Sequence, residues 1–139
     1  MTMDMPKNVD SAINLLQLAG VEAYAVGGCV RDSLLGKTPN DWDITTSAKP
    51  EDMKSVFINF HCIDTGIKHG TVTVVIDGEP LEITTFRLDG EYEDNRHPKS
   101  VTFTSNLGAD LGRRDFTINA MAYSKMTGTV DLFGGEKDL

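Results

Sequence analysis

Two aspartates separated by a single residue form the sharpest chemical feature of the sequence. Asp41 and Asp43 flank Trp42 in residues 41–46, whose alternation and β-branched side chains predict a strand. Side chains at i and i+2 of a strand share a face, so the carboxylates would lie about 5 to 7 Å apart. Such a pair favours a cation between its members, and Mg²⁺ prefers hard oxygen ligands. Taken alone, this motif would favour a solvated strand edge over a metal site. Trp42 points to the opposite face of the strand and is expected to pack in the core.

A third carboxylate lies in a different β-like run. Glu82 stands within residues 81–85, which are otherwise apolar or β-branched. Charged residues are rare at central strand positions unless they are paired or bind a metal. If this strand lies beside the one that carries Asp41 and Asp43, Glu82 completes a cluster of three carboxylates. The alternative is an edge strand with Glu82 in water.

A pair of glycines precedes these acids. Gly27 and Gly28 stand between an apolar run and a helix-like segment. Backbone N–H groups in such a turn can approach an anion, and the helix dipole adds attraction for phosphate. Arg31 follows and can add a charge-assisted contact. A lone Gly-Gly is usually only a turn, but the aspartates that follow at once favour phosphate binding here.

A basic cluster lies near the end of the sequence, in residues 113–122. Adjacent arginines on a helix point to different sides, so one of Arg113 and Arg114 could bind phosphate while the other pairs internally. Asp115 could accept hydrogen bonds from ribose hydroxyls, and Asn119 is grouped with it as a candidate nucleotide-binding residue. A charged helix surface is the alternative.

The remaining sequence predicts the elements that would position these residues. Asn8 is expected to cap the first helix, and Ser47 the third. Residues 88–105 are long, polar and charged, with a basic island at 96–99, so a loop is expected there. Periodicity predicts helices at 8–20, 30–35, 50–57 and 107–124, the last either continuous or broken near residues 113–114. It predicts strands at 22–26, 41–46, 61–64, 71–76, 81–87 and 129–133.

Composition limits the class of protein. The 139 residues suit one domain, and 40% hydrophobic with 24% charged residues is ordinary globular usage. A net charge of −8 excludes general attraction of nucleic acid, so RNA would need a local basic patch or sequence absent here. Cys29 and Cys62 are expected to be reduced thiols, and His61 and His69 lack partners at metal-ligand spacing. With no signal peptide or membrane-spanning run, the protein is expected to be soluble and cytoplasmic.

The order of these motifs resembles that of class II tRNA nucleotidyltransferases and bacterial poly(A) polymerases. The resemblance covers roughly residues 21–139, and the motifs are far more specific together than singly. In chain order they are Gly-Gly-x-Val-Arg-Asp, Leu-Leu-Gly-Lys-x-Pro-x-Asp-x-Asp-Ile, Lys-His-Gly-Thr-Val-Thr-Val, Leu-Glu-Ile-Thr-Thr-Phe-Arg and Arg-Arg-Asp-Phe-Thr-Ile-Asn-Ala-Met-Ala.

The resemblance implies both a fold and a set of site residues. The implied fold is α+β, a nucleotidyltransferase fold of the DNA polymerase beta type, with a small mixed sheet of about five strands flanked by helices. Asp41 and Asp43 match the family's metal-binding pair, and Glu82 its third carboxylate. The triphosphate-binding motif is matched by Gly27, Gly28 and Arg31, and the motif that contacts the nucleotide sugar and phosphates by Arg114 and Asp115.

The implied activity is template-independent addition of CMP and AMP, from CTP and ATP, to the 3′ end of tRNA with Mg²⁺ as cofactor. Residues 1–139 would form the catalytic head, without the family's neck, body and tail, through which most tRNA contacts would be made. The base-pairing Glu-Asp-x-x-Arg motif of the neck does not occur in the sequence. A poly(A) polymerase is the alternative, although residues 66–72 look more like CCA-adding members. In isolation the chain could be a nucleotide-binding module without efficient catalysis.

Overall fold

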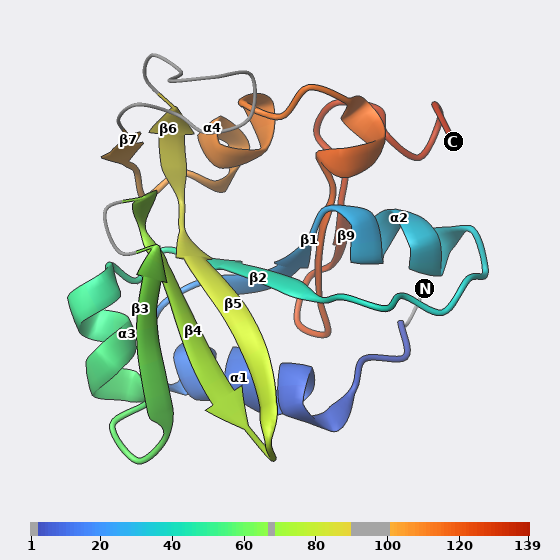
Figure 1. Ribbon diagram of the computed structural model, residues 1–139. Coiled ribbons are helices and arrows are strands. Elements are labelled where there is room, and N and C mark those ends of the chain that lie inside the picture. Colours follow the sequence, from blue (N-terminus) through green and yellow to red (C-terminus); the bar gives the residue numbers. More distant parts are fainter. Residues whose placement is uncertain (1–2, 67–68, 90–100) are drawn as a thin grey trace.

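The computed structural model describes residues 3–66, 69–89 and 101–139, which contain both helices and strands (Figure 1). A single large sheet lies at the centre. The elements are α1 Lys7–Leu18, β1 Ala23–Val26, α2 Gly28–Leu34, β2 Asp43–Thr46, α3 Pro50–Val56, β3 His61–Gly66, β4 Thr71–Ile76, β5 Glu79–Thr85, β6 Arg87–Asp89, β7 Val101–Phe103, α4 Leu107–Gly112, the short 3₁₀ helix η2 Thr117–Asn119, β8 Ala122–Ser124 and β9 Gly128–Val130.

The main sheet is mixed. Its strand order is β3-β4-β5-β2-β1-β8-β9, while β6 and β7 pair in a separate two-stranded sheet. Only the β2–β5 pair in the described sheet is parallel. A parallel pair needs a long connection, here α3 followed by the β3–β4 hairpin. The expected fold of a mixed sheet flanked by helices is confirmed, with seven strands in the main sheet instead of about five.

One face of the sheet carries the main hydrophobic core. Ile44 of β2, Ile83 of β5 and Val74 of β4 are all buried there. Helix α1 buries Ile13 and Leu16 in the same cluster and contacts β1, β2 and α3. Each of these buried aliphatic side chains contributes roughly 1.5–3 kcal/mol of transfer free energy. This packing fixes which face of each strand is left to carry polar residues.

The opposite face of β5 is polar. Leu81 and Ile83 are buried, so strand alternation turns Glu82 to the other side, where its side chain is exposed. Further along that side, Thr84 forms a hydroxyl–hydroxyl hydrogen bond of 2.9 Å with Thr71 of β4. The middle of the sheet therefore presents carboxylate and hydroxyl groups away from the main core.

A smaller core covers another part of the sheet. Tyr24 and Phe86 stack with ring centroids 6.3 Å apart, and Leu111 of α4 is fully buried in the same cluster. The cluster joins α4 to β1 and to the chain that enters β6. Helix α4 is thereby held over the sheet, beside the polar centre.

The helix predicted over 107–124 ends at Gly112, beside the break considered near residues 113–114, and the prediction is wrong beyond that point. Helix α4 ends there, η2 follows, and Ala122–Ser124 forms strand β8, which pairs with β1 and is fully buried. A continuous run of apolar residues such as 120–123 suits a fully buried helix segment and a doubly covered strand equally well, so periodicity alone could not separate them.

Two of the predicted caps are also wrong. Asn8 lies inside α1, where its Oδ1 accepts a hydrogen bond from the Val9 N–H, and Pro6 occupies the capping position. Ser47 Oγ accepts from the Glu22 N–H at 2.9 Å, and Lys49 precedes α3 instead. In both cases a proline with a preset φ starts or precedes the helix without a side-chain cap.

The loop predicted over 88–105 is wrong at both of its ends. Arg87–Asp89 and Val101–Phe103 pair as antiparallel strands β6 and β7 at its two ends. The basic island at 96–99 lies outside the described residues. Both cysteines are free thiols, as predicted, and Cys29 is buried beneath the turn before α2.

We expect Gly135→Ala to destabilise the chain by about 1–3 kcal/mol, because a small-to-large change here has no room to relax. A Cβ on Gly135 would collide with the carbonyl oxygen of Thr117 and stand 2.9 Å from Cγ of Met121. Urea unfolding measures the loss. In the control Gly112→Ala, the new Cβ meets only the ring of Phe133 at 3.3 Å, and a change below about 0.5 kcal/mol is expected. Equal effects of the two substitutions would contradict the packing of this turn.

Candidate active site

Asp43 and Glu82 lie side by side in the middle of the sheet. Asp43 opens β2, Glu82 lies in β5, and the two residues are Cα partners in the parallel pairing of these strands. Thr73 of β4 is the partner of Glu82 on its other side. The expected neighbourhood of the two strands is therefore correct. Glu82 is on a central strand, so the alternative of an edge strand is excluded, although its side chain does face solvent.

Asp41 reaches the same place from outside the sheet. The expectation of a strand that contains both aspartates is wrong, because β2 begins at Asp43. Alternation nevertheless extends beyond the strand, since Trp42 and Ile44 both belong to the main core and the two aspartates are both exposed. Trp42 is only 9% exposed, which confirms its predicted packing role.

A pocket of about 710 Å³ opens where β2 stops. Pairing of β2 with β5 begins at Asp43 and Glu82, so the chain before Asp43 diverges from the start of β5. The space between them is bounded on one side by the beginning of α1. Asp41, Asp43 and Glu82 all line this pocket, together with Thr73. The three carboxylates singled out in the sequence therefore face one cavity.

Asp43 has the electrostatic character of a crowded acidic site. Desolvation by the surrounding protein atoms raises its pKa, the charges of Glu82 and Asp41 raise it further, and Arg114 opposes them. The residue as a whole is still exposed, so water reaches the carboxylate and screens part of this repulsion. A cation shared by these carboxylates would remove the like-charge contribution to the raised pKa.

The donor set fits Mg²⁺ in a particular way. Among residues 3–66, 69–89 and 101–139, no three His, Cys, Asp or Glu side chains are gathered closely enough to hold a metal ion by themselves. Mg²⁺ does not require such a cage, because it usually keeps several waters and binds through one or two carboxylates plus substrate phosphates. Asp43 and Glu82, in register on adjacent strands, match that mode of binding.

The glycine turn adjoins the acidic pair. Val26 is the Cα partner of Asp43, and Gly27 follows it with φ 84° and ψ −135°, a conformation open mainly to glycine. The Gly27 N–H donates to the carbonyl oxygen of Met121 at 3.2 Å, so that group is already engaged.

The glycines leave room for two guanidinium groups. A Cβ on Gly27 would lie 3.6 Å from Nη1 of Arg114, and one on Gly28 would lie 3.2 Å from Nη2 of Arg31. In this structure the glycine pair therefore lets cationic side chains approach the backbone. The cations, with the nearby main chain, form the basic side of the site.

Arg31 and Asn119 meet across the chain. Arg31 Nη1 donates to Oδ1 of Asn119 at 2.9 Å, and its Nε donates to Oδ1 of Asp32 at 3.0 Å. Helix α2 contacts η2, which brings these residues together although 88 positions separate them. Two motifs that are distant in sequence thus share one location.

Arg114 lies close to charges of both signs. Its pKa is lowered, chiefly by desolvation and next by the charge of Arg113, while Asp110 and Asp43 act to raise it. Its guanidinium faces Gly27, as described above. The neighbouring Asp115 has an exposed side chain, so it is free to meet a ligand from solvent.

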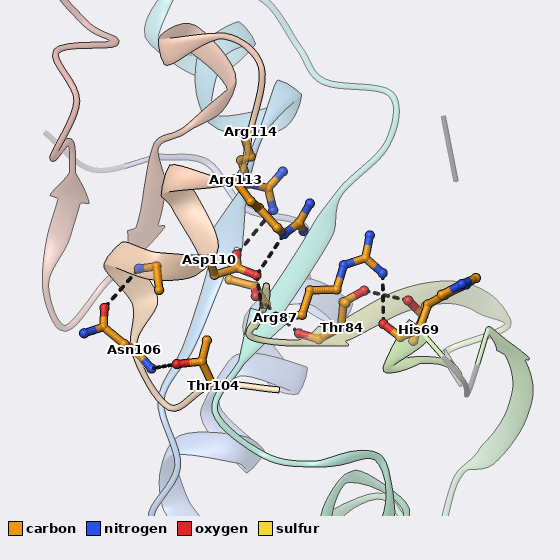
Figure 2. Close-up of polar contacts among 11 residues, drawn as sticks. His69, Thr84, Arg87, Thr104, Asn106, Asp110, Arg113 and Arg114 are labelled. Atoms are coloured by element: carbon orange, nitrogen blue, oxygen red, sulfur yellow. Dashed lines mark hydrogen bonds and ion pairs between the residues drawn. The ribbon is translucent and has the colours of Figure 1, made fainter. Parts of the chain in front are cut away.

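Sequence analysis missed Asp110. This residue is fully buried in α4, and both Arg113 and Arg114 approach its carboxylate, at 3.4 and 3.6 Å (Figure 2). The signal was present, because positions i+3 and i+4 on a helix lie on the same face as position i.

The chain is similar in sequence to known proteins. The family model for the poly A polymerase head domain matches residues 23–139. The CCA-adding enzyme of Lactobacillus helveticus is 56% identical over 127 residues, which are 91% of this chain and 31% of that protein. The chain thus spans about a third of the length of that relative.

Solved structures give the same result. The crystal structure of the Bacillus stearothermophilus CCA-adding enzyme in complex with CTP matches with a TM-score of 0.83 and 45% identity, over 96% of this chain and 32% of that one. A tRNA nucleotidyltransferase complexed with a primer tRNA and an incoming ATP analog matches with a TM-score of 0.66 and 29% identity, over 91% and 36%. No helix within the described ranges is both long and apolar enough to cross a bilayer.

We expect Asp43→Asn to stabilise the metal-free chain slightly at neutral pH, by less than about 1 kcal/mol because water screens an exposed like-charge pair. Folding raises the pKa of Asp43. The ionised carboxylate therefore costs stability above that pKa, and the gain should vanish as the pH falls and the carboxyl group is protonated. Urea unfolding at several pH values measures both effects.

Mg²⁺ provides the second half of this test. It should raise the unfolding midpoint of the wild-type chain and not that of Asp43→Asn, because only the former retains the carboxylate pair. Asp52→Asn, which removes an exposed acid from the first turn of α3, is the control and should still respond to Mg²⁺. Loss of stability in Asp43→Asn at neutral pH would refute the repulsion between Asp43 and Glu82.

Proposed function

The chain belongs to the poly A polymerase head domain family, and from that premise we propose that it supplies the metal and triphosphate site of an enzyme that adds CMP and AMP to the 3′ end of tRNA. The donors would be CTP and ATP. The observation that carries this proposal is the pairing of Asp43 with Glu82 beside the Gly27 turn, in a pocket that Asp41 also lines.

In this proposal residues 1–139 form the head domain, and the regions present only in the longer relatives choose the base and hold the tRNA. The charge of this chain supports that division of labour. Its net charge of −8 repels an RNA backbone, so the chain would need basic surface from elsewhere in the protein to retain tRNA.

The residues of the site divide into acidic and basic roles. Asp43 and Glu82, with Asp41, would hold Mg²⁺, which when bound lowers the pKa of an attacking hydroxyl and neutralises charge on the leaving pyrophosphate by a two-metal arrangement. Arg114 and Arg31, next to Gly27 and Gly28, would bind the triphosphate through charge-assisted hydrogen bonds. Asp115 would position the nucleotide sugar. Asn119 would position the side chain of Arg31, to which it is hydrogen-bonded.

The proposed chemistry is an in-line displacement. The 3′ oxygen of the RNA attacks the α-phosphorus of the nucleotide, a new P–O bond forms, and the bond to pyrophosphate breaks. Such transfer depends on positioning and on electrostatic stabilisation, with little covalent work for the protein. In this arrangement the acidic residues of β2 and β5 would hold one side of the reacting phosphate through Mg²⁺. Arg31 and Arg114 would hold the other side directly.

A poly(A) polymerase is the second candidate, favoured by the description of the matching family. The two activities differ in the nucleotides they use. A tRNA that lacks its CCA end, supplied separately with CTP or ATP, separates them. Incorporation of CMP supports CCA addition, whereas ATP-only tailing supports the polymerase.

We expect Asp41→Ala and Asp43→Ala each to lower nucleotide incorporation by more than about 100-fold, because each removes a carboxylate that would hold Mg²⁺ against the reacting phosphate. The assay uses a chimera in which this chain replaces the corresponding region of the Lactobacillus helveticus enzyme, which is 56% identical to it. Asp52→Ala in the same chimera is the control and should retain activity. Normal incorporation by the Asp43→Ala chimera would end the proposed role of this residue.

The 139-residue chain alone should bind Mg²⁺-nucleotides weakly and with little base preference, because base selection is assigned to regions outside it. Titration calorimetry with CTP and UTP tests this expectation. Affinities within about threefold of each other, or a difference below roughly 0.7 kcal/mol, are expected. Strong discrimination of CTP from UTP would show that the head itself selects the base.

A further inference from the structure

Asp110 is the only charged residue that is buried within the described part of the chain, with none of its surface exposed. Burying a carboxylate is costly unless opposite charges and hydrogen bonds compensate it. It lies in α4 and touches neither the pocket nor the glycine turn directly. The burial of this charge in so short a helix therefore indicates a role in addition to packing.

The carboxylate joins three parts of the fold (Figure 2). Oδ1 accepts a hydrogen bond from the backbone N–H of Arg87 at 3.0 Å, which ties α4 to the first residue of β6. The same oxygen accepts from Nε of Arg113 at 3.4 Å. Oδ2 lies 3.6 Å from Nη2 of Arg114.

The two terminal nitrogens of Arg114 face different partners. One terminal nitrogen is near Asp110, and the other, Nη1, is 3.6 Å from the position of a Cβ on Gly27. The positive charge of Arg114 also acts on Asp43, where it opposes the overall rise of that residue's pKa. The guanidinium therefore spans the distance between a buried anion and the proposed triphosphate site.

The contact to Arg114 is electrostatic more than it is a tight hydrogen bond. The 3.6 Å separation exceeds the usual length of about 2.7–2.9 Å for a charge-assisted hydrogen bond. Within the described residues, Oδ2 of Asp110 and Nε of Arg114 have no hydrogen-bond partner. Both of these atoms are buried, so an incoming phosphate would meet Nη1, the terminal nitrogen of Arg114 that faces Gly27.

We propose that Asp110 is a positioning residue, which orients the guanidinium of Arg114 toward the triphosphate of the nucleotide. This inference rests on the proposed function, because it assigns Arg114 to the triphosphate. The competing explanation is that Asp110 only anchors α4 to β6 through the Arg87 N–H. The two explanations differ in whether the effect of Asp110 on ligand binding depends on Arg114.

A double-mutant cycle separates these explanations. Trp42 is the only tryptophan and lines the pocket, so its fluorescence can follow titration of the complete 139-residue chain with Mg²⁺-CTP. Asp110→Asn and Arg114→Met should each weaken binding by about tenfold, and the double variant should bind no more weakly than Arg114→Met alone. Losses that multiply in the double variant would overturn the proposal.

One control variant and two further outcomes keep the explanations distinct. Asp10→Asn removes an acid from a surface pair with Lys125 and should bind Mg²⁺-CTP as the wild type does. If Arg114→Met binds normally, the assignment of Arg114 in the proposed function fails. If Arg114→Met weakens binding while Asp110→Asn does not, only the positioning role of Asp110 fails.

A variant at a buried charge can lose the fold. Unfolding of each variant is therefore followed in parallel, and titrations of an unstable variant are repeated, with the wild type, in trimethylamine N-oxide, which favours the compact state. Asp110→Glu restores the charge and should bind within about threefold of the wild type. A folded Asp110→Glu chain that binds as weakly as Asp110→Asn would also overturn the proposal.

Discussion

Repulsion between two carboxylates held in register is the constraint on which the site depends. The parallel pairing of β2 with β5 places Asp43 beside Glu82, and the burial of Ile44 and Ile83 on the opposite face prevents either strand from rotating away. A register shift of one residue would exchange the two faces and place the acids in the core. The sheet therefore maintains an unfavourable contact that a divalent cation bound between the two carboxylates would make favourable.

The cationic side of the site is assembled in a different manner. It depends on side-chain contacts between segments far apart in sequence, such as Arg31 with Asn119, in place of strand pairing. Gly27 and Gly28 contribute by having no side chains, so that Arg114 and Arg31 can lie against the backbone. In an acidic protein, positive charge is thus brought to the candidate site by two arginines.

Much of this arrangement could be predicted from the sequence, within physical limits. The position of Glu82 in an apolar run was sufficient to suggest an acidic cluster, because burial of its neighbours on both sides fixes its direction. Strand β8 could not be recognised, since its buried apolar residues match either kind of element. Asp110 was missed because its importance comes from three-dimensional contacts with Arg87 and Arg114, and only its spacing to the arginines was visible beforehand.

The strand order has one more consequence. The edges of the main sheet are β3 and β9, whereas Asp43 and Glu82 lie on β2 and β5, well inside it. Local opening of a folded protein begins at its edges and ends, where amide protons exchange fastest with solvent. Fraying of the outer strands would leave the acidic pair paired and aligned. The proposed metal-binding pair is thus separated from both edges of the sheet, at the point where the parallel pairing of β2 with β5 begins.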